Sequence, residues 1–128
     1  MDPRQFEELM AAAYEECGYQ VTLTPRSGDH GRDLIAVKRG FGAIKVLNQV
    51  KRYKPNHVVS ADDARALLGV LVGDPAASKG VLTTTSSFAP RILDDPAIGN
   101  AVPTRLQLIN GQELQVLLGR IANGEIAL

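Results

Sequence analysis

Several features are scarce in this sequence, and each scarcity excludes a class of protein. Cys17 is the only cysteine, which excludes an intramolecular disulfide framework and a cysteine-rich zinc site. His30 and His57 are isolated from Cys17 and from each other, so a zinc site is not expected. No apolar run approaches the length needed to cross a bilayer. The first 17 residues carry several acids and no long apolar stretch. No secretory signal is therefore expected, and a cytoplasmic setting is the simplest interpretation.

The chain also lacks net charge, with 14 acidic and 14 basic residues. This balance excludes an overall basic protein that coats nucleic acid. The charges are nevertheless unevenly placed, because residues 38–54 contain bases and no acid. Such a local basic stripe can dock phosphates, and a solvated charged hairpin is the alternative interpretation.

The length and the apolar content indicate one domain over residues 1–128. Apolar spacing and turn residues predict a mixed order of helices and strands along the chain. The predicted helices cover residues 3–17, a segment beginning after Ser60, a short segment near 91–95, and 112–122. The predicted strands cover residues 19–24, a hairpin over 33–52, 79–85 and 106–109. This order predicts an α/β fold with a mixed sheet covered by helices on both faces.

Helical spacing in the first segment predicts which side chains are buried. The expected buried face consists of Phe6, Leu9, Met10, Ala13, Tyr14 and Cys17. Glu7 lies at the border of this face, from where it can reach around to a site beside the sheet. Ser60 is the expected N-cap of the next long helix, with Asp62 and Asp63 in the first turn, where the helix dipole favours acids.

The hairpin carries the residues with the clearest chemical potential. Asp33 opens its first strand, and Gln49 and Lys51 close its second. Side chains alternate along a strand, so Gln49 and Lys51 point to the same face, and antiparallel pairing folds them back toward Asp33. A carboxylate, an amide oxygen and an ammonium group at one end of a hairpin can hold a divalent cation and position a water. The alternatives are a loop-capping role for Asp33 and a fraying strand end at residues 49–51.

The sequence resembles the Mrr-type restriction endonuclease catalytic domain, a branch of the PD-(D/E)xK nuclease superfamily. The resemblance covers nearly the whole chain, from about Pro3 to Leu118. It is carried, in order, by residues 6–7, 18–19, 27–36, 49–53, 79–86 and 108–114.

The resemblance implies a restriction-endonuclease-like mixed central sheet and magnesium-dependent hydrolysis of DNA phosphodiesters, with manganese as a substitute ion. Asp33 matches the metal-binding acid of the family, and Lys51 matches its catalytic lysine. Gln49 takes the place of the second acid, and Glu7 matches the acid of the first helix. The expected catalytic residues are therefore Asp33, Gln49, Lys51 and Glu7, and the expected metal ligands are Asp33, Gln49 and Glu7.

DNA is the expected partner, with no membrane involved. The backbone-binding residues that we expect are Arg26, Arg32, Arg52 and Lys54. Two-strand cleavage usually requires two active sites, which is compatible with a homodimer, and a separate recognition or regulatory domain or subunit is compatible with this chain. Two features depart from the family pattern: His30 and Arg32 in the loop, and a long, proline-rich segment over residues 88–105.

Two other functions stay open from the sequence. One is a structure-selective nuclease on the same fold, similar to a junction resolvase. The other is a non-catalytic DNA-binding or assembly module, which the missing carboxylate at position 49 and the neutral net charge would suit.

Overall fold

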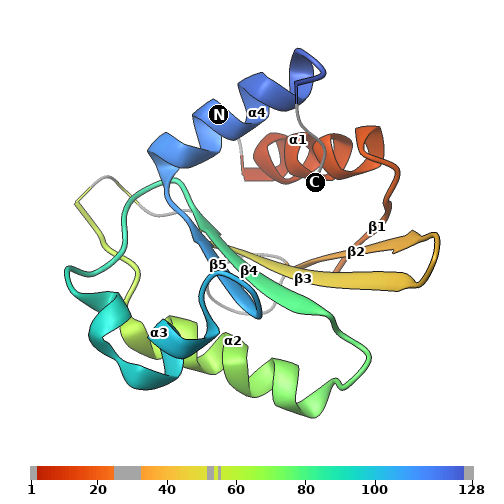
Figure 1. Ribbon diagram of the computed structural model, residues 1–128. Helices are drawn as coiled ribbons and strands as arrows, with labels where there is room; N and C mark the ends of the chain where they lie inside the picture. Colours follow the sequence, from red (N-terminus) through yellow and green to blue (C-terminus); the bar gives the residue numbers. More distant parts are fainter. Residues whose placement is uncertain (1–2, 25–32, 52–53, 55, 126–128) are drawn as a thin grey trace.

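A five-stranded mixed sheet forms the centre of the molecule (Figure 1). The computed structural model describes residues 3–24, 33–51, 54 and 56–125, without the side chains of residues 3–5 and 33. The strands lie in chain order: β1 (Gln20–Leu23), β2 (Asp33–Arg39), β3 (Ala43–Lys51), β4 (Lys79–Thr84) and β5 (Leu106–Ile109). The pairs β1–β2 and β2–β3 are antiparallel, whereas β3–β4 and β4–β5 are parallel. The predicted α/β fold and the predicted hairpin are therefore confirmed.

Helices cover both faces of the sheet, as predicted (Figure 1). Helices α1 (Pro3–Glu16) and α4 (Gly111–Ala122) lie on one face. Helices α2 (Ala61–Gly73) and α3 (Pro96–Ala101) lie on the other, with the short 3-10 helix η1 (Ile92–Asp94). Each face has its own apolar core, because side chains alternate between the two sides of every strand. None of the helices within the described residues has the length and apolar character needed to span a membrane.

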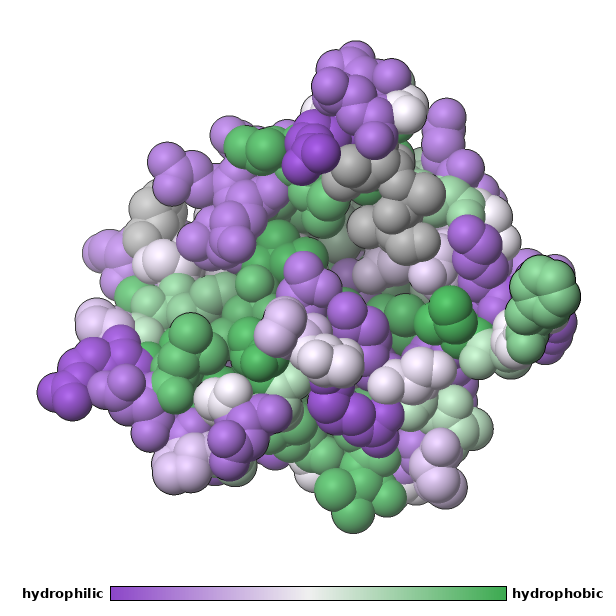
Figure 2. Space-filling view, in the orientation of Figure 1, coloured by the Kyte–Doolittle hydropathy of each residue, from purple (hydrophilic) through white to green (hydrophobic). Residues whose placement is uncertain are grey.

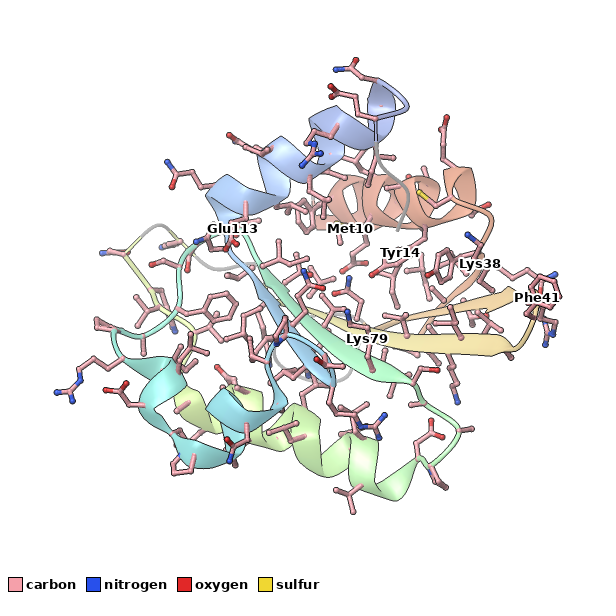
Figure 3. All side chains as sticks on the ribbon, viewed as in Figure 1. Met10, Tyr14, Lys38, Phe41, Lys79 and Glu113 are labelled. Carbon is pink, nitrogen blue, oxygen red and sulfur yellow. The ribbon has the colours of Figure 1, made fainter. Side chains whose placement is uncertain are left out.

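The buried face of α1 is rotated from the one that the sequence predicts. Phe6, Met10 and Tyr14 are buried as expected, but Leu9 is 42% exposed, so that part of the prediction was wrong. Glu7, expected at the border, lies within the buried face and is only 3% exposed. Tyr14 packs edge to face on Tyr19 beyond the helix end, with ring centroids 5.3 Å apart. Met10 and Tyr14 thus lie between α1 and the sheet (Figure 3), which turns Leu9 outward.

Reciprocal side-chain caps begin the two longer helices that follow the hairpin. Ser60 caps α2 as predicted: its hydroxyl oxygen accepts from the Asp63 backbone N–H, and the Asp63 carboxylate accepts from the Ser60 backbone N–H. Asn110 caps α4 in the same way with Glu113. Gly111 is needed at the start of α4 because a Cβ there would lie 2.4 Å from the Thr85 carbonyl oxygen. The start of α4 is therefore pressed against the end of β4.

The proline-rich segment after β4 is more ordered than its sequence suggests. The short helix predicted near residues 91–95 is the 3-10 helix η1, and α3 follows it directly. Asp95 caps α3 by accepting hydrogen bonds from the backbone N–H groups of Ala97 and Ile98, and Pro96 occupies a first-turn position. Ile92 and Ile98 are buried against α2, so this segment completes the core on that face.

Candidate active site

The pairing of β2 with β3 places the predicted site residues on one face of the sheet. Asp33 lies directly opposite Gln49, and directly opposed residues project to the same side. Lys51 follows two positions after Gln49 and shares that side. Leu47 has the same parity and packs on Leu71 of α2. Positions 33, 49 and 51 therefore face the α2 side, although the Asp33 side chain lies outside the described residues.

Gln49 has a buried acceptor that the described part of the chain leaves unsatisfied. Its side chain is partly exposed, yet the Oε1 atom is fully buried, and no donor among the described residues reaches it. A buried carbonyl oxygen without a donor costs free energy, and hard cations such as magnesium bind oxygens of this kind. The donor chemistry at position 49 therefore fits a divalent ion.

The neighbouring amide on β3 differs in both direction and partners. Asn48 faces α1, where its Nδ2 group donates to the Tyr14 hydroxyl at 2.9 Å. The Thr83 hydroxyl donates to Asn48 Oδ1 at 2.8 Å. Burial raises the pKa of Tyr14 to about 12, and the hydrogen bond from Asn48 opposes this shift. All three side chains are buried, so this network joins α1, β3 and β4 in the core.

Lys51 ends β3 as a nearly buried cation, only 9% exposed. Its Nζ atom lies 4.0 Å from Oδ1 of Asp63, in the first turn of α2. The sequence predicted only a helix-dipole role for Asp63, and this contact was not predicted. The shared parity of Lys51 and Leu47 is the sequence signal that points Lys51 toward the helix after β3.

Glu7 approaches from the opposite face of the sheet, because α1 packs on that face with Phe6 and Met10 in its core. It lies two helical turns before Tyr14. Figure 1 shows that the early turns of α1 lie toward the end of the sheet away from the β2–β3 hairpin tip. That end carries Asp33 and Lys51. A role for Glu7 as a ligand stays a prediction that requires reaching around the end of the sheet.

Hydroxyl groups at the end of β4 serve the local structure. Thr84 Oγ1 accepts from the Ser86 backbone N–H, and Ser86 Oγ donates to the His57 carbonyl oxygen at 2.6 Å. Thr84 is also the parallel partner of Lys51. These contacts hold the turn after β4 beside the lysine. The hydroxyls of Thr84 and Ser86 thus stabilise a turn.

The predicted DNA-binding residues fall mainly outside the described residues. Arg26, Arg32 and Arg52 lie outside the described residues, and their DNA-binding role stays a prediction. Lys54 is described and is exposed. Across residues 6–24, 34–51, 54 and 56–125, no three histidine, cysteine, aspartate or glutamate side chains gather as a metal site. The predicted metal ligation by Asp33 and Gln49 stays a prediction.

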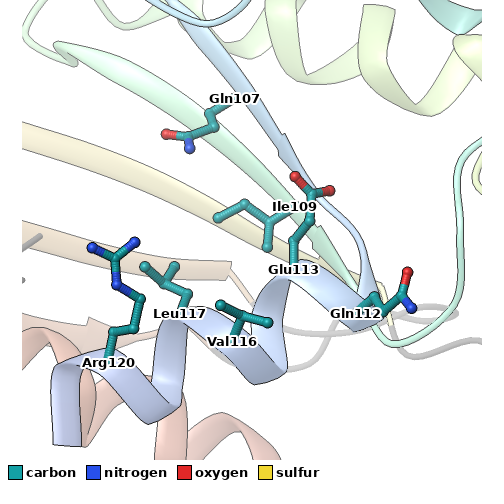
Figure 4. Close-up of a pocket in the computed structure, with 7 residues that line it drawn as sticks. All are labelled: Gln107, Ile109, Gln112, Glu113, Val116, Leu117 and Arg120. Carbon is teal, nitrogen blue, oxygen red and sulfur yellow. The ribbon is translucent and has the colours of Figure 1, made fainter. Parts of the chain in front are cut away.

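A hollow of about 460 Å³ lies elsewhere, between β5 and α4. Figure 4 shows Gln107 and Ile109 of β5 facing Val116 and Arg120 of α4 across it. This hollow is on the α1–α4 side of the sheet, opposite the side that Gln49 and Lys51 face.

Apolar residues are scattered among polar ones on the face drawn in Figure 2. Phe41, fully exposed at the hairpin tip (Figure 3), is remote from the strand ends at 33 and 51.

Comparison with known proteins finds a family match over most of the chain. A family model for the Mrr catalytic domain, described as restriction endonuclease, matches residues 1–118. No curated protein matches the chain.

Three solved structures are similar in fold. The DNA modification-dependent restriction endonuclease AspBHI aligns with a TM-score of 0.62 and 21% identity, covering 96% of this chain and 32% of AspBHI. The MspJI restriction endonuclease, solved in complex with a 27-mer oligonucleotide, aligns with a TM-score of 0.60 and 24% identity, covering 94% of this chain and 29% of MspJI. AF1548, a protein of unknown function, aligns with a TM-score of 0.68 and 14% identity, covering 96% of this chain and 67% of AF1548. The chain thus spans about a third of the length of the first two.

Proposed function

Because the chain belongs to the restriction endonuclease family that the Mrr catalytic-domain model describes, we propose that it is a metal-dependent DNA endonuclease. The observation that carries this proposal is the buried Gln49 Oε1, which no donor among the described residues reaches, two residues before Lys51 and opposite position 33. A buried amide oxygen that no described donor reaches is costly for the fold. This cost in folding free energy is explained if Gln49 and Lys51 serve the binding and cleavage of a substrate.

Asp33, Gln49 and Glu7 would hold a magnesium ion, with manganese as a substitute. When bound, the ion would polarise the scissile phosphate and lower the pKa of a coordinated water. Gln49 contributes a neutral oxygen, so the affinity for the ion should be modest without DNA phosphate oxygens. The described environment of Gln49 supports its role as a ligand. The ligand roles of Asp33 and Glu7 rest on the family resemblance.

Lys51 would place its ammonium group beside the scissile phosphate. Its burial limits competition from water and strengthens its interaction with charge that develops on the phosphate. The lysine either orients the attacking water or neutralises that charge. Arg26, Arg32, Arg52 and Lys54 would bind the flanking backbone, where contacts carry no sequence information and weaken with salt.

A plasmid assay tests the proposal. Supercoiled DNA is incubated with the full chain, with and without magnesium, beside the Asp33→Ala and Lys51→Ala variants. We expect magnesium-dependent nicking or linearisation that each variant lowers by at least about a hundredfold, with circular dichroism of Lys51→Ala unchanged. Full activity in Lys51→Ala would refute the role of the lysine.

The same assay separates the competing functions. Preference for four-way junctions over linear duplex would favour a structure-selective nuclease. DNA binding without cleavage under either ion would favour a non-catalytic module. Sedimentation of the chain with DNA measures whether it forms the homodimer that two-strand cleavage would require. A recognition domain or subunit outside this chain is compatible with the longer AspBHI and MspJI chains.

A further inference from the structure

We propose that Asp63 is a positioning residue for Lys51, a role that rests on the proposed nuclease function. The carboxylate of Asp63 lies across from the lysine on the same side of the sheet, with Oδ1 4.0 Å from Nζ. It belongs to α2 and is separated from Lys51 by the connector after β3. Asp63 would thereby hold the ammonium group toward the strand ends at positions 33 and 49.

The capping interaction fixes the Asp63 carboxylate in place. Its Oδ2 atom accepts a hydrogen bond from the Ser60 backbone N–H at 3.3 Å, and its own backbone N–H donates to Ser60 Oγ at 3.3 Å. One carboxylate oxygen thus anchors the side chain to the helix end, which leaves the other facing Lys51. A rigid helix terminus is a better support for a catalytic group than a free loop side chain.

The neighbouring acid shows that this placement is specific to one of the two. Asp62 has the same charge and lies in the same helical turn, but its side chain is 85% exposed and pairs with Arg65. The Asp63 side chain is 29% exposed and turns toward the sheet. Both acids can interact favourably with the dipole of α2 from its first turn, but only Asp63 of the two contacts Lys51.

Burial explains why Lys51 needs an acid at this distance. The lysine side chain is 11% exposed, and a cation removed from water requires a nearby opposite charge. Position 49 supplies a neutral amide in place of an acid. A separation of 4.0 Å exceeds hydrogen-bond length, so Asp63 supplies charge without occupying the N–H donors of the lysine. Asp63 therefore leaves those donors to other partners, such as a water or a phosphate oxygen.

The test compares three variants of the full chain on plasmid DNA with magnesium. Asp63→Asn removes the charge but keeps an oxygen that can accept from the Ser60 N–H. Asp62→Asn removes the same charge one residue away, and Ser60→Ala weakens the helix cap without touching the charge. We expect Asp63→Asn to lower kcat between about tenfold and about a hundredfold. Its KM and its affinity for a fluorescent duplex without divalent ions should change less than about twofold.

The controls decide between positioning and general effects. Asp62→Asn should keep the wild-type kcat. Ser60→Ala should lower the melting temperature but keep the wild-type kcat, because the Ser60 backbone N–H that anchors Asp63 Oδ2 is retained. Asp63→Glu should recover part of the lost kcat, since its charge returns. An unchanged kcat in Asp63→Asn, or an equal loss in Asp62→Asn or Ser60→Ala, would overturn the inference and leave the nuclease proposal standing. If the wild-type chain does not cleave DNA, the nuclease proposal fails and this one fails with it.

Discussion

Two adjacent amide side chains on β3 have opposite environments. Asn48 faces α1 and has a hydrogen-bond partner at each end of its amide, since it donates to Tyr14 and accepts from Thr83 within the core. Gln49 faces α2, and its buried oxygen receives no hydrogen bond from the described residues. The same functional group is thus used in two ways, one residue apart, on the two faces of one sheet.

The difference separates a structural role from a candidate functional one. A buried polar network that satisfies every member stabilises one arrangement of its elements, here α1 against β3 and β4. A buried oxygen that no group of the folded chain satisfies lowers the stability of that chain, and a ligand can supply the missing partner. Replacing each amide with an apolar residue of similar shape should therefore have opposite consequences for stability and for activity.

The largest effect on stability should follow Asn48→Leu. The change removes two hydrogen bonds and leaves the buried hydroxyls of Tyr14 and Thr83 without their partner. We expect the free energy of unfolding to fall by about 3 kcal/mol. Urea unfolding monitored by circular dichroism measures it. A loss below about 0.5 kcal/mol would mean that the Asn48 network does not stabilise the core, and the contrast with Gln49 would disappear.

Gln49→Met is the matched change on the other face. It removes an oxygen that has no described partner, so stability should stay the same or rise slightly. The magnesium concentration for half-maximal cleavage should increase about tenfold. Manganese titration by calorimetry provides a measurement without DNA cleavage. A marked loss of stability with unchanged metal dependence would instead show that Gln49 is structural like Asn48.

The smallest effect concerns Tyr14, through its pH dependence. Tyr14→Phe should lower stability near neutral pH by about 1 kcal/mol, because Asn48 loses its acceptor. The pKa of Tyr14 is raised to about 12 in the folded chain, from an ordinary value of 10.0. Its stabilising contribution is fully present below the unfolded value and is lost as pH rises from about 10 through about 12, because the unfolded chain ionises first.

Urea unfolding of the wild type and Tyr14→Phe at about pH 8 and about pH 11 checks this sign. The stability difference between the two proteins should shrink at the higher pH. A difference that grows there would mean that the folded state favours the ionised phenol, contrary to its burial.

Local patterns predicted much of the fold and part of the site. Alternation along β3 predicted that Gln49 and Lys51 share a face, and the Gly-containing turn predicted the pairing that brings position 33 opposite 49. The Ser60 cap was also readable, because capping depends on residues a few positions apart. The errors arose where packing decides: Leu9 turned outward, and Glu7 became buried.

By itself, the sequence determined the strands, the parity of the polar residues and the resemblance to a nuclease family, because these depend on neighbours along the chain. Tertiary structure alone decided which amide is satisfied and which acid faces the lysine. The partners of Asn48 are 34 and 35 residues away in sequence, and Asp63 meets Lys51 only after α2 packs on the sheet. Such contacts form between side chains of separate elements, so the packing of those elements sets them.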